Sequence, residues 1–397
     1  MTPRDGQTDS DTNIWLGATA GFCASFVALG IARFAYTPLI PALIAAQWYT
    51  PSEADYLGAA NLAGYLAGAV LGRTMLRRAS AAQLLRLMMA LTAASLFACA
   101  AHDLGLVWAN VWRFVSGYTG GAIMVLAAPL VVANVPPSHR GLVSGVVFAG
   151  VGSGIVAAGV VVPWLLAATG PLGTWLGLGA ICALLTLVAW AGWPKHGLEI
   201  SRGGNAAPRP ALAIPIVALF VEYAFNAVGL VPHALFFLDY VARGLQRGME
   251  AAGGYWVIYG IGAAIGPVVA GEVADYIGFS LSLRLAFLCQ AMAVGLAAFT
   301  EDPLWLGVSA FGAGALTIGI VALVLGRLGD FLDDPGARQR AWATATVAFS
   351  VGQALAAYGY SWLLAKFHGF PMIFLIAALA MIVALAIDLV MGRTRRA

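Results

Sequence analysis

The amino-acid sequence predicts an all-α integral membrane protein whose twelve transmembrane helices form two pseudo-symmetric six-helix bundles. Hydrophobic residues make up 61% of the 397 residues and charged residues only 10%, whereas about a quarter of an ordinary soluble domain is charged. Apolar runs of about 20 residues, the length that crosses a bilayer core, alternate with short polar breaks along the whole chain. The longest polar break lies near the middle and divides the runs into two sets of six.

Each apolar run is interpreted as a helix, because the strands of a membrane barrel would instead alternate over about ten residues. The predicted helices span residues 14–42, 55–76, 81–101, 105–132, 141–168, 171–193, 211–240, 251–277, 280–300, 304–328, 341–366 and 369–391. The first six form an N-terminal bundle, residues 1–193, and the last six form a C-terminal bundle, residues 211–397. The break between them, 194–210 with the sequence PKHGLEISRGGNAAPRP, is predicted to be a cytoplasmic linker.

Two helix starts carry local sequence signals. Thr50-Pro51-Ser52-Glu53 has the pattern of a capping box with proline at the first helical position. Ser80-Ala81-Ala82-Gln83 has the same capping pattern before the third helix. The first thirteen residues are polar, and no A-x-A cleavage site follows the first apolar run, so the first helix is predicted to be a retained membrane helix.

The distribution of basic residues predicts the orientation in the membrane. If both termini are cytoplasmic, sixteen of the 21 Lys and Arg residues lie in inner loops and tails and three lie in outer loops. The other two, Arg33 and Arg113, lie within predicted helices. This positive-inside bias favours a multi-pass protein with both termini in the cytoplasm.

Composition and motifs exclude several classes of function. A soluble enzyme of this size could not bury so much apolar surface in one core, and a net charge of +3 does not indicate a nucleic-acid partner. The sequence has no G-x-x-x-x-G-K-[ST] loop for nucleotide binding and no C-x-x-C pair among its four cysteines. We therefore expect no enzymatic activity, no cofactor, no metal and no nucleic-acid partner, in a monomer whose surroundings are the lipid bilayer.

A repeated glycine pattern relates the two halves of the sequence. Gly68-x-x-x-Gly72 closes one predicted helix, and Gly271-x-x-x-Asp275 closes another in the second half. The two patterns stand close to half the chain length apart, and each is followed by a short inner loop. The repetition predicts two related halves, in which Gly68 corresponds to Gly271, and such a plan is common among transporters.

These features together resemble the major facilitator superfamily, and the resemblance covers the whole chain. The loop motif of that superfamily, Gly-x-x-x-Asp-Arg-x-Gly-Arg-Lys, is matched by Gly271, Asp275 and Gly278 in the second half. The first-half copy keeps Arg73 but has Gly72 at the acidic position. The segments GIARFAYTPLIPALIAA and GAANLAGYLAGA, which begin at residues 30 and 58, resemble the YbfB/YjiJ-type branch.

The resemblance implies a secondary transporter of the bacterial inner (cytoplasmic) membrane that works by alternating access. It places helices 1, 4, 7 and 10 around a central cavity. It also implies a cytoplasmic gate in which Asp275 lies near the start of helix 5. The gating residues that it implies are Arg73, Arg140, Gly271, Asp275 and Gly278.

Three charged residues lie inside predicted spans, where a charge at the helix centre costs about 3 kcal/mol. Arg33 in helix 1 could hold a carboxylate or phosphate through two parallel hydrogen bonds, or it could be a structural arginine. Arg113 opens an Arg-x-x-x-Gly pattern that the resemblance links to gating or proton movement, or it could serve helix packing. Glu222 is about eleven residues into helix 7 and therefore near the midplane. It could carry a proton, because burial favours the neutral carboxyl group, or it could be a permanent partner of an arginine.

Other polar residues within the spans are candidates for the same site. His233, the possible pseudo-symmetric counterpart of Arg33, is a candidate for proton coupling together with Glu222 and Arg113, or an interfacial histidine. Each of the remaining candidates could line the cavity or join helices by hydrogen bonds. They are Tyr36, Asn61, Tyr65, Asn226 and Gln353.

Three hypotheses of function follow. The buried charges are +2 from the two arginines and −1 from Glu222, so the net buried charge is positive. A positive cavity favours a proton-coupled transporter of a small anionic metabolite. The alternative is a proton-coupled efflux pump for lipophilic compounds, since Gly150 and Gly154 in helix 5 partly match the glycine motif of exporters, although Ile155 replaces its proline. The third hypothesis is a non-transporting membrane sensor or scaffold, against which the short tails and loops argue.

Overall fold

The computed structural model describes residues 3–194, 214–367 and 369–394. The chain divides into two compact units, Met1–Ile200 and Ser201–Ala397, and each is described by itself. All but Pro194 of the predicted cytoplasmic linker, 194–210, lies outside the described residues. Helical segments that are 3-10 or π helices are labelled η, and the others α.

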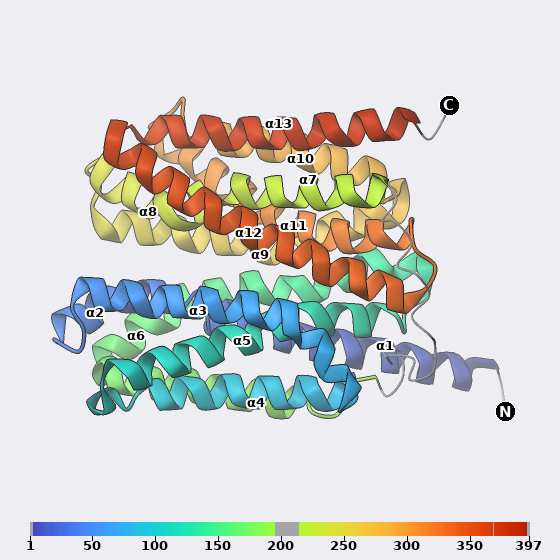
Figure 1. Ribbon diagram of the computed structural model, residues 1–397, viewed down its shortest axis with the longest axis horizontal. Helices are drawn as coiled ribbons and strands as arrows, with labels where there is room; N and C mark the ends of the chain where they lie inside the picture. The colour runs from blue at the N-terminus through green and yellow to red at the C-terminus, as the bar shows by residue number, and fades with distance from the viewer. Residues whose placement is uncertain (1–2, 195–213, 368, 395–397) are drawn as a thin grey trace. The chain divides into compact units, whose positions relative to one another are not determined.

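The first unit consists of long helices that pack along their lengths (Figure 1). Its elements are α1 (Pro3–Ser25), η1 (Phe26–Ile31), α2 (Tyr36–Ala45), α3 (Pro51–Leu71), η2 (Gly72–Arg77), α4 (Ala81–Cys99), η3 (His102–Leu104), α5 (Gly105–Val132), η4 (Pro137–His139) and α6 (Arg140–Ala189). Helix α5 lies at the centre of these contacts, since it packs against α1, α3, α4 and α6.

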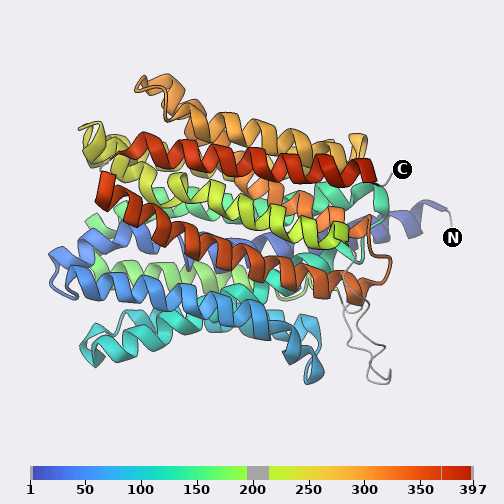
Figure 2. The ribbon, with the colours of Figure 1, turned by 45° about the horizontal axis from the view of Figure 1, so that its top comes forward.

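The second unit also consists of long helices that pack along their lengths (Figure 2). Its elements are α7 (Ile214–Val231), η5 (Pro232–Phe236), α8 (Phe237–Asp239), η6 (Tyr240–Gly244), α9 (Gly248–Ile277), α10 (Phe279–Leu296), α11 (Pro303–Gly329), α12 (Pro335–Phe367) and α13 (Phe370–Thr394). Helix α11 packs against α9 and α10, as α5 packs against α3 and α4.

The described chain supplies a helix for each of the twelve that the sequence predicts. Nine of its stretches are long and apolar enough to cross a membrane. One of these, Pro137–Ala189, contains two predicted helices, because α6 continues through a non-helical residue, Gly170, at φ 68°. Helices α3 and α12 account for the other two. The predicted all-α fold of two pseudo-symmetric six-helix bundles is confirmed.

The first membrane segment of each unit is not the single α-helix that the sequence predicts. Residues 14–42 are interrupted by the π helix η1 and by a turn before α2, and residues 211–240 are interrupted by η5. Prolines explain part of the difference, because a proline has no N–H to donate within a helix. Pro232 begins η5, whereas η1 contains no proline and has no such local cause.

Both predicted capping boxes are present. The backbone N–H of Glu53 donates to Thr50 Oγ1 at 3.3 Å, and the backbone N–H of Thr50 donates to the Glu53 carboxylate at 2.8 Å. Ser80 and Gln83 exchange the same pair of hydrogen bonds at the start of α4. These bonds satisfy N–H groups that the first turn of a helix leaves without a partner.

The register of the internal repeat differs from the one that the sequence predicts. The step along the chain from α4, at Ala81, to α10, at Phe279, equals the step from α5, at Gly105, to α11, at Pro303. The same step leads from Gly68 to Gly266, which make equivalent contacts. A Cβ atom on Gly68 would lie 1.9 Å from the Tyr118 carbonyl, and one on Gly266 would lie 2.2 Å from the Ala315 carbonyl. Gly68 therefore corresponds to Gly266, and the predicted correspondence with Gly271 is wrong.

Candidate functional site

Five of the predicted site residues come together in the first unit. We call Arg33, Tyr36, Asn61, Tyr65 and Arg113 the arginine cluster. The cluster contains two arginines. Arg113, on α5, is the more buried of them, with 2% of its surface exposed. Its Nη1 donates to the Ala32 carbonyl at 2.9 Å, and its guanidinium carbon lies 4.2 Å from the centre of the Tyr36 ring.

Helix packing fixes the position of Arg113. A Cβ atom on Gly117 would lie 1.9 Å from the Asn61 carbonyl, so glycine is needed for α5 to approach α3 this closely. At the same contact Asn61 Nδ2 donates to the Arg113 carbonyl at 3.2 Å. Tyr36 is anchored separately, because its hydroxyl donates to the Ala54 carbonyl at 2.8 Å.

Arg33 provides the second positive charge of the cluster. It follows η1, where the chain turns toward α2, and it is half-buried. Its guanidinium carbon lies 5.3 Å from the centre of the buried Tyr65 ring and 5.4 Å from that of Phe34. Arginine stacks on aromatic rings through its planar, weakly hydrated guanidinium, so these rings help to hold the Arg33 side chain in place.

The arginine cluster carries two positive charges on a largely buried scaffold. Among the residues that the structure describes, no carboxylate forms an ion pair with Arg113, and its Nε has no hydrogen-bond partner. A permanent ion pair inside the described N-terminal bundle therefore does not explain Arg113. A buried guanidinium whose Nε lacks an acceptor is suited to binding a carboxylate or phosphate oxygen.

Glu222 lies in a separate pocket of the second unit. The pocket is lined by α7, α11, α13 and the turn after α11, with Glu222, Arg327 and Asp388 as its charged residues and room for about one water molecule. Arg327 is in the last turn of α11, and Asp388 is near the end of α13. Glu222 thus lies beside side chains from the ends of α11 and α13.

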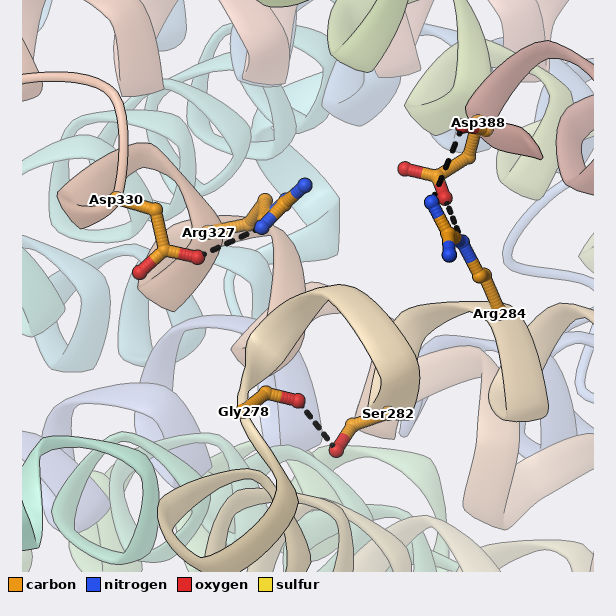
Figure 3. Close-up of polar contacts among 6 residues, drawn as sticks. All are labelled: Gly278, Ser282, Arg284, Arg327, Asp330 and Asp388. Carbon is orange, nitrogen blue, oxygen red and sulfur yellow. Dashed lines mark hydrogen bonds and ion pairs between the residues drawn. The ribbon is translucent and has the colours of Figure 1, made fainter. Parts of the chain in front are cut away.

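The arginines beside Glu222 already have other partners (Figure 3). Arg284 forms an ion pair with Asp388 and also donates to the Asp388 carbonyl at 3.4 Å. Arg327 donates to the Asp330 carboxylate at 2.8 Å. Glu222 is 2% exposed, its Oε2 accepts no hydrogen bond, and no cation of the described chain pairs with it. The hypothesis that Glu222 is a permanent partner of an arginine therefore finds no support within the described residues.

The remaining predicted residues of the second unit have separate neighbours. Asn226, one turn after Glu222, donates to the Thr317 carbonyl at 3.5 Å. His233 is buried, with 1% of its surface exposed. Its Nε2 lies 2.9 Å from Ser309 Oγ, and its ring stacks on Phe237. Gln353 is buried in α12.

The residues that the sequence assigns to a gate lie at or near helix ends. Arg73 is in η2, and Arg140 begins α6, where its Nε donates to the Val135 carbonyl at 3.2 Å. Gly271 is buried within α9, and Asp275 is in the last turn of that helix. Gly278 lies between α9 and α10 and has φ 85°, a conformation that favours glycine. The turn is therefore sufficient to explain why this position is a glycine.

Helix packing also accounts for the glycines of the exporter-like motif. A Cβ atom on Gly150 would lie 2.2 Å from the Phe22 carbonyl. One on Gly154 would lie 2.4 Å from the Cα atom of Gly30. These glycines let α6 approach α1 and η1 closely. The motif therefore carries no separate indication of drug efflux.

Comparison with known proteins agrees with this architecture. A family described as "Uncharacterised MFS-type transporter YbfB" matches residues 25–389. A search of curated proteins found no match.

Several solved structures share the fold at low sequence identity. The E. coli fucose:proton symporter FucP is 16% identical, with a TM-score of 0.71 over 93% of this chain and 97% of that chain. A bacterial homologue of the iron transporter ferroportin, in an outward-facing state, is 14% identical, with a TM-score of 0.72 over 96% and 98%. The proton:xylose symporter XylE is 16% identical, with a TM-score of 0.76 over 95% of each chain.

Because the family match spans most of the sequence and the fold agrees, the chain is a multi-pass membrane protein that belongs to the YbfB-type family of major facilitator superfamily transporters.

Proposed function

We propose that the protein is a proton-coupled secondary transporter that carries a small organic anion across the bacterial inner membrane by alternating access. The arginine cluster binds the anion, and Glu222 carries the proton. Both termini are cytoplasmic, and the protein works as a monomer without a cofactor. The two six-helix bundles, 1–193 and 211–397, move around the bound substrate, and the linker 194–210 joins them.

The observation that carries this proposal is the buried charge of Arg113. A charge within a membrane span costs about 3 kcal/mol at the helix centre, and no carboxylate of the described chain offsets it. An anionic substrate would offset it directly, through charge-assisted hydrogen bonds to Nε and to the neighbouring Arg33. Asn61 and Tyr65 then limit the size and shape of the anion.

Glu222 suits the role of proton carrier because its surroundings leave its charge unpaired. Arg284 and Arg327 are occupied by Asp388 and Asp330, so a proton is the simplest means of neutralising the buried carboxylate. Arg113 and His233 assist proton movement. Arg73, Arg140, Asp275, Gly271 and Gly278 form the cytoplasmic gate. A monovalent anion that enters with one proton moves no net charge across the membrane.

Thermal stabilisation of the purified protein by a mixed panel tests the proposal. The panel contains monocarboxylates, dicarboxylates, phosphate esters and lipophilic cations. We expect stabilisation by a carboxylate or phosphate ester in the wild type and its loss in Arg33→Gln. Arg86→Gln is the matched control, because Arg86 is an arginine of α4 that donates to the Trp190 carbonyl outside the cluster. Stabilisation by lipophilic cations that survives Arg33→Gln would instead favour the efflux hypothesis.

A further inference from the structure

Arginines gather at one end of the first unit, where the chain passes from α3 to α4. Arg73 and Arg77 lie in η2, Arg78 follows it, and Arg86 lies in the second turn of α4. Arg77 and Arg78 are exposed, and Arg86 is half-buried. No described carboxylate forms an ion pair with Arg77, Arg78 or Arg86. This end of the unit therefore presents positive charge that the described side chains leave without a counter-charge.

The sequence keeps acidic residues away from these arginines. No Asp or Glu occurs between Asp55 and Asp103. Asp55 is near the start of α3, whose other end leads into η2, and Asp103 follows the far end of α4. A helix of about 20 residues is roughly 30 Å long, whereas a charge in physiological salt is screened over about 8 Å. The acidic residues that flank this stretch therefore do not cancel its charge.

Arg86 is held against the end of α6. Its Nε donates to the Trp190 carbonyl at 2.7 Å, and its guanidinium carbon lies 5.6 Å from the centre of the Trp190 ring. Trp190 follows the last residue of α6, and α4 packs against α6. A snorkelling arginine would extend its charged group into water. The Arg86 guanidinium is instead fixed on the protein surface where the two helices meet.

The contact with Trp190 leaves one edge of the guanidinium available. The bond from Nε is the only hydrogen bond that Arg86 makes within the described residues. The edge formed by Nη1 and Nη2 is left for an acceptor, and its geometry matches two oxygens of a phosphate. Because the carbonyl and the ring already orient the guanidinium, less side-chain freedom is lost when a phosphate binds there.

The surroundings of Arg86 are those of a lipid-facing surface. Trp190 is 48% exposed, and Leu187, one turn earlier in α6, is 69% exposed. Leu87, the next residue after Arg86, is 49% exposed. Arg86 lies five residues after Ala81, the first residue of α4, which is roughly 8 Å along the helix axis. A soluble phosphate would leave these apolar side chains uncovered, whereas the acyl chains of a phospholipid would pack on them.

We propose that Arg86 and Trp190 bind the phosphate of an anionic phospholipid where α4 meets the end of α6. Nη1 and Nη2 of Arg86 donate to two phosphate oxygens, the Trp190 ring orients the guanidinium, and Arg77 and Arg78 add positive potential. In the orientation proposed above, the lipid belongs to the cytoplasmic leaflet. The binding does not rest on the proposed transport function and can be measured without a transport substrate.

Thermal unfolding of the full chain in neutral detergent micelles tests the proposal. Phosphatidylglycerol or phosphatidylcholine is added stepwise at equal mole fractions in about 150 mM NaCl, the physiological ionic strength. We expect a saturable rise of about 2–4 °C in Tm with phosphatidylglycerol. Phosphatidylcholine should give a smaller rise or none, because its headgroup cation offsets the phosphate charge. Equal rises with the two lipids would overturn the proposal.

Variants of Arg86 locate the site. Arg86→Gln should lose most of the rise with phosphatidylglycerol. Arg86→Lys keeps the charge but has neither the planar fork nor the stacking, so its rise should be clearly smaller than that of the wild type. A full rise in either variant would overturn the site, and Arg86→Lys decides if Arg86→Gln does not fold.

Arg33→Gln is the matched control for net charge, because it also removes one positive charge from the first unit. It should keep the full rise with phosphatidylglycerol. An equal loss of the rise in Arg33→Gln and Arg86→Gln would show that the lipid responds to net charge alone, and it would overturn the site.

The lipid site is separable from the arginine cluster of the proposed function. Glycerol 3-phosphate carries the phosphate without acyl chains, so any stabilisation that it gives through the cluster should be lost in Arg33→Gln and kept in Arg86→Gln. Stabilisation by glycerol 3-phosphate that depends on Arg86 would assign the site to a free phosphate and overturn the lipid. Absence of the phosphatidylglycerol effect, with carboxylate stabilisation intact, would remove the lipid site and leave the anion site standing.

Discussion

The guanidinium carbon of Arg113 lies 4.2 Å from the centre of the Tyr36 ring, and the same guanidinium donates to the Ala32 carbonyl. An aromatic face and a carbonyl orient the positive charge without neutralising it. The Arg113 side chain is thus held in place with its full charge and with Nε still without an acceptor. This arrangement is that of a binding residue, because a purely structural arginine would be expected to have its charge and its N–H groups satisfied by the protein.

Replacement of Arg113 by glutamine should therefore separate stability from binding. Removing a buried charge that no described carboxylate balances should leave Tm unchanged or higher without ligand, although the bond to Ala32 is lost. Stabilisation by the carboxylate found in the panel should disappear. Thermal unfolding with and without that carboxylate measures both effects, and Arg86→Gln serves again as the control. A large fall in Tm together with an intact carboxylate shift would mean that Arg113 is structural.

Glu222→Gln should remove the dependence of transport on the pH gradient. The substitution keeps the shape of the side chain and leaves the charged groups that surround it, Arg284, Arg327, Asp330 and Asp388, in their existing pairs. Uptake of the carboxylate into proteoliposomes, with and without an imposed pH gradient, is the measurement. Asp330→Asn is the control, since it changes a nearby carboxylate that is already paired. Undiminished acceleration by the gradient in Glu222→Gln would show that another group carries the proton.

Gly117→Ala should destabilise the protein and disturb the arginine cluster. A Cβ atom there would lie 1.9 Å from the Asn61 carbonyl, so α3 and α5 must separate, at a cost of about 1–3 kcal/mol or more. The control is Gly253→Ala in α9, where a Cβ atom would meet nothing within 4 Å. The gain in helix propensity there favours a stability equal to or above that of the wild type. Thermal unfolding compares the two, and equal Tm values would refute the close contact.

The capping box at the start of α3 should make stability depend on pH. Hydrogen bonds from the Thr50 backbone and hydroxyl stabilise the Glu53 carboxylate and lower its pKa below the ordinary value. A lowered folded-state pKa contributes stability above the unfolded-state value, and that stability is lost as pH falls through the folded-state value. The Tm of the wild type should therefore fall further than the Tm of Thr50→Val when the pH is lowered below about 4.3, the ordinary glutamate pKa. Parallel pH profiles would contradict this account.

Local signals in the sequence were sufficient for much of the fold. Capping boxes depend on residues three positions apart, so Thr50 with Glu53 and Ser80 with Gln83 could be recognised without tertiary information. The length of the apolar runs likewise predicted twelve helices. The π helix η1 could not be predicted, because its sequence, FVALGI, is that of an ordinary apolar helix and no local residue marks the change.

The first unit's site residues were predictable, whereas part of the second unit's arrangement was not. Arg33 and Arg113 stand out because a charge in an apolar run needs a reason. Their proximity to Tyr36, Asn61 and Tyr65 depends on helix rotation, which the structure supplies. Gln290 gave no comparable signal, because a single uncharged polar residue in a membrane helix most often joins neighbouring helices.

The most direct test of the central claim is proton movement driven by the anion. Proteoliposomes containing a pH-sensitive dye receive the carboxylate identified in the panel, and protein-free liposomes correct for passive entry of the acid. The account predicts acidification of the lumen beyond that of protein-free liposomes in the wild type. It also predicts that this extra acidification is absent in both Arg113→Gln and Glu222→Gln. Carboxylate uptake by the wild type without any extra acidification would contradict the account. Extra acidification in both variants equal to that of the wild type would contradict it as well.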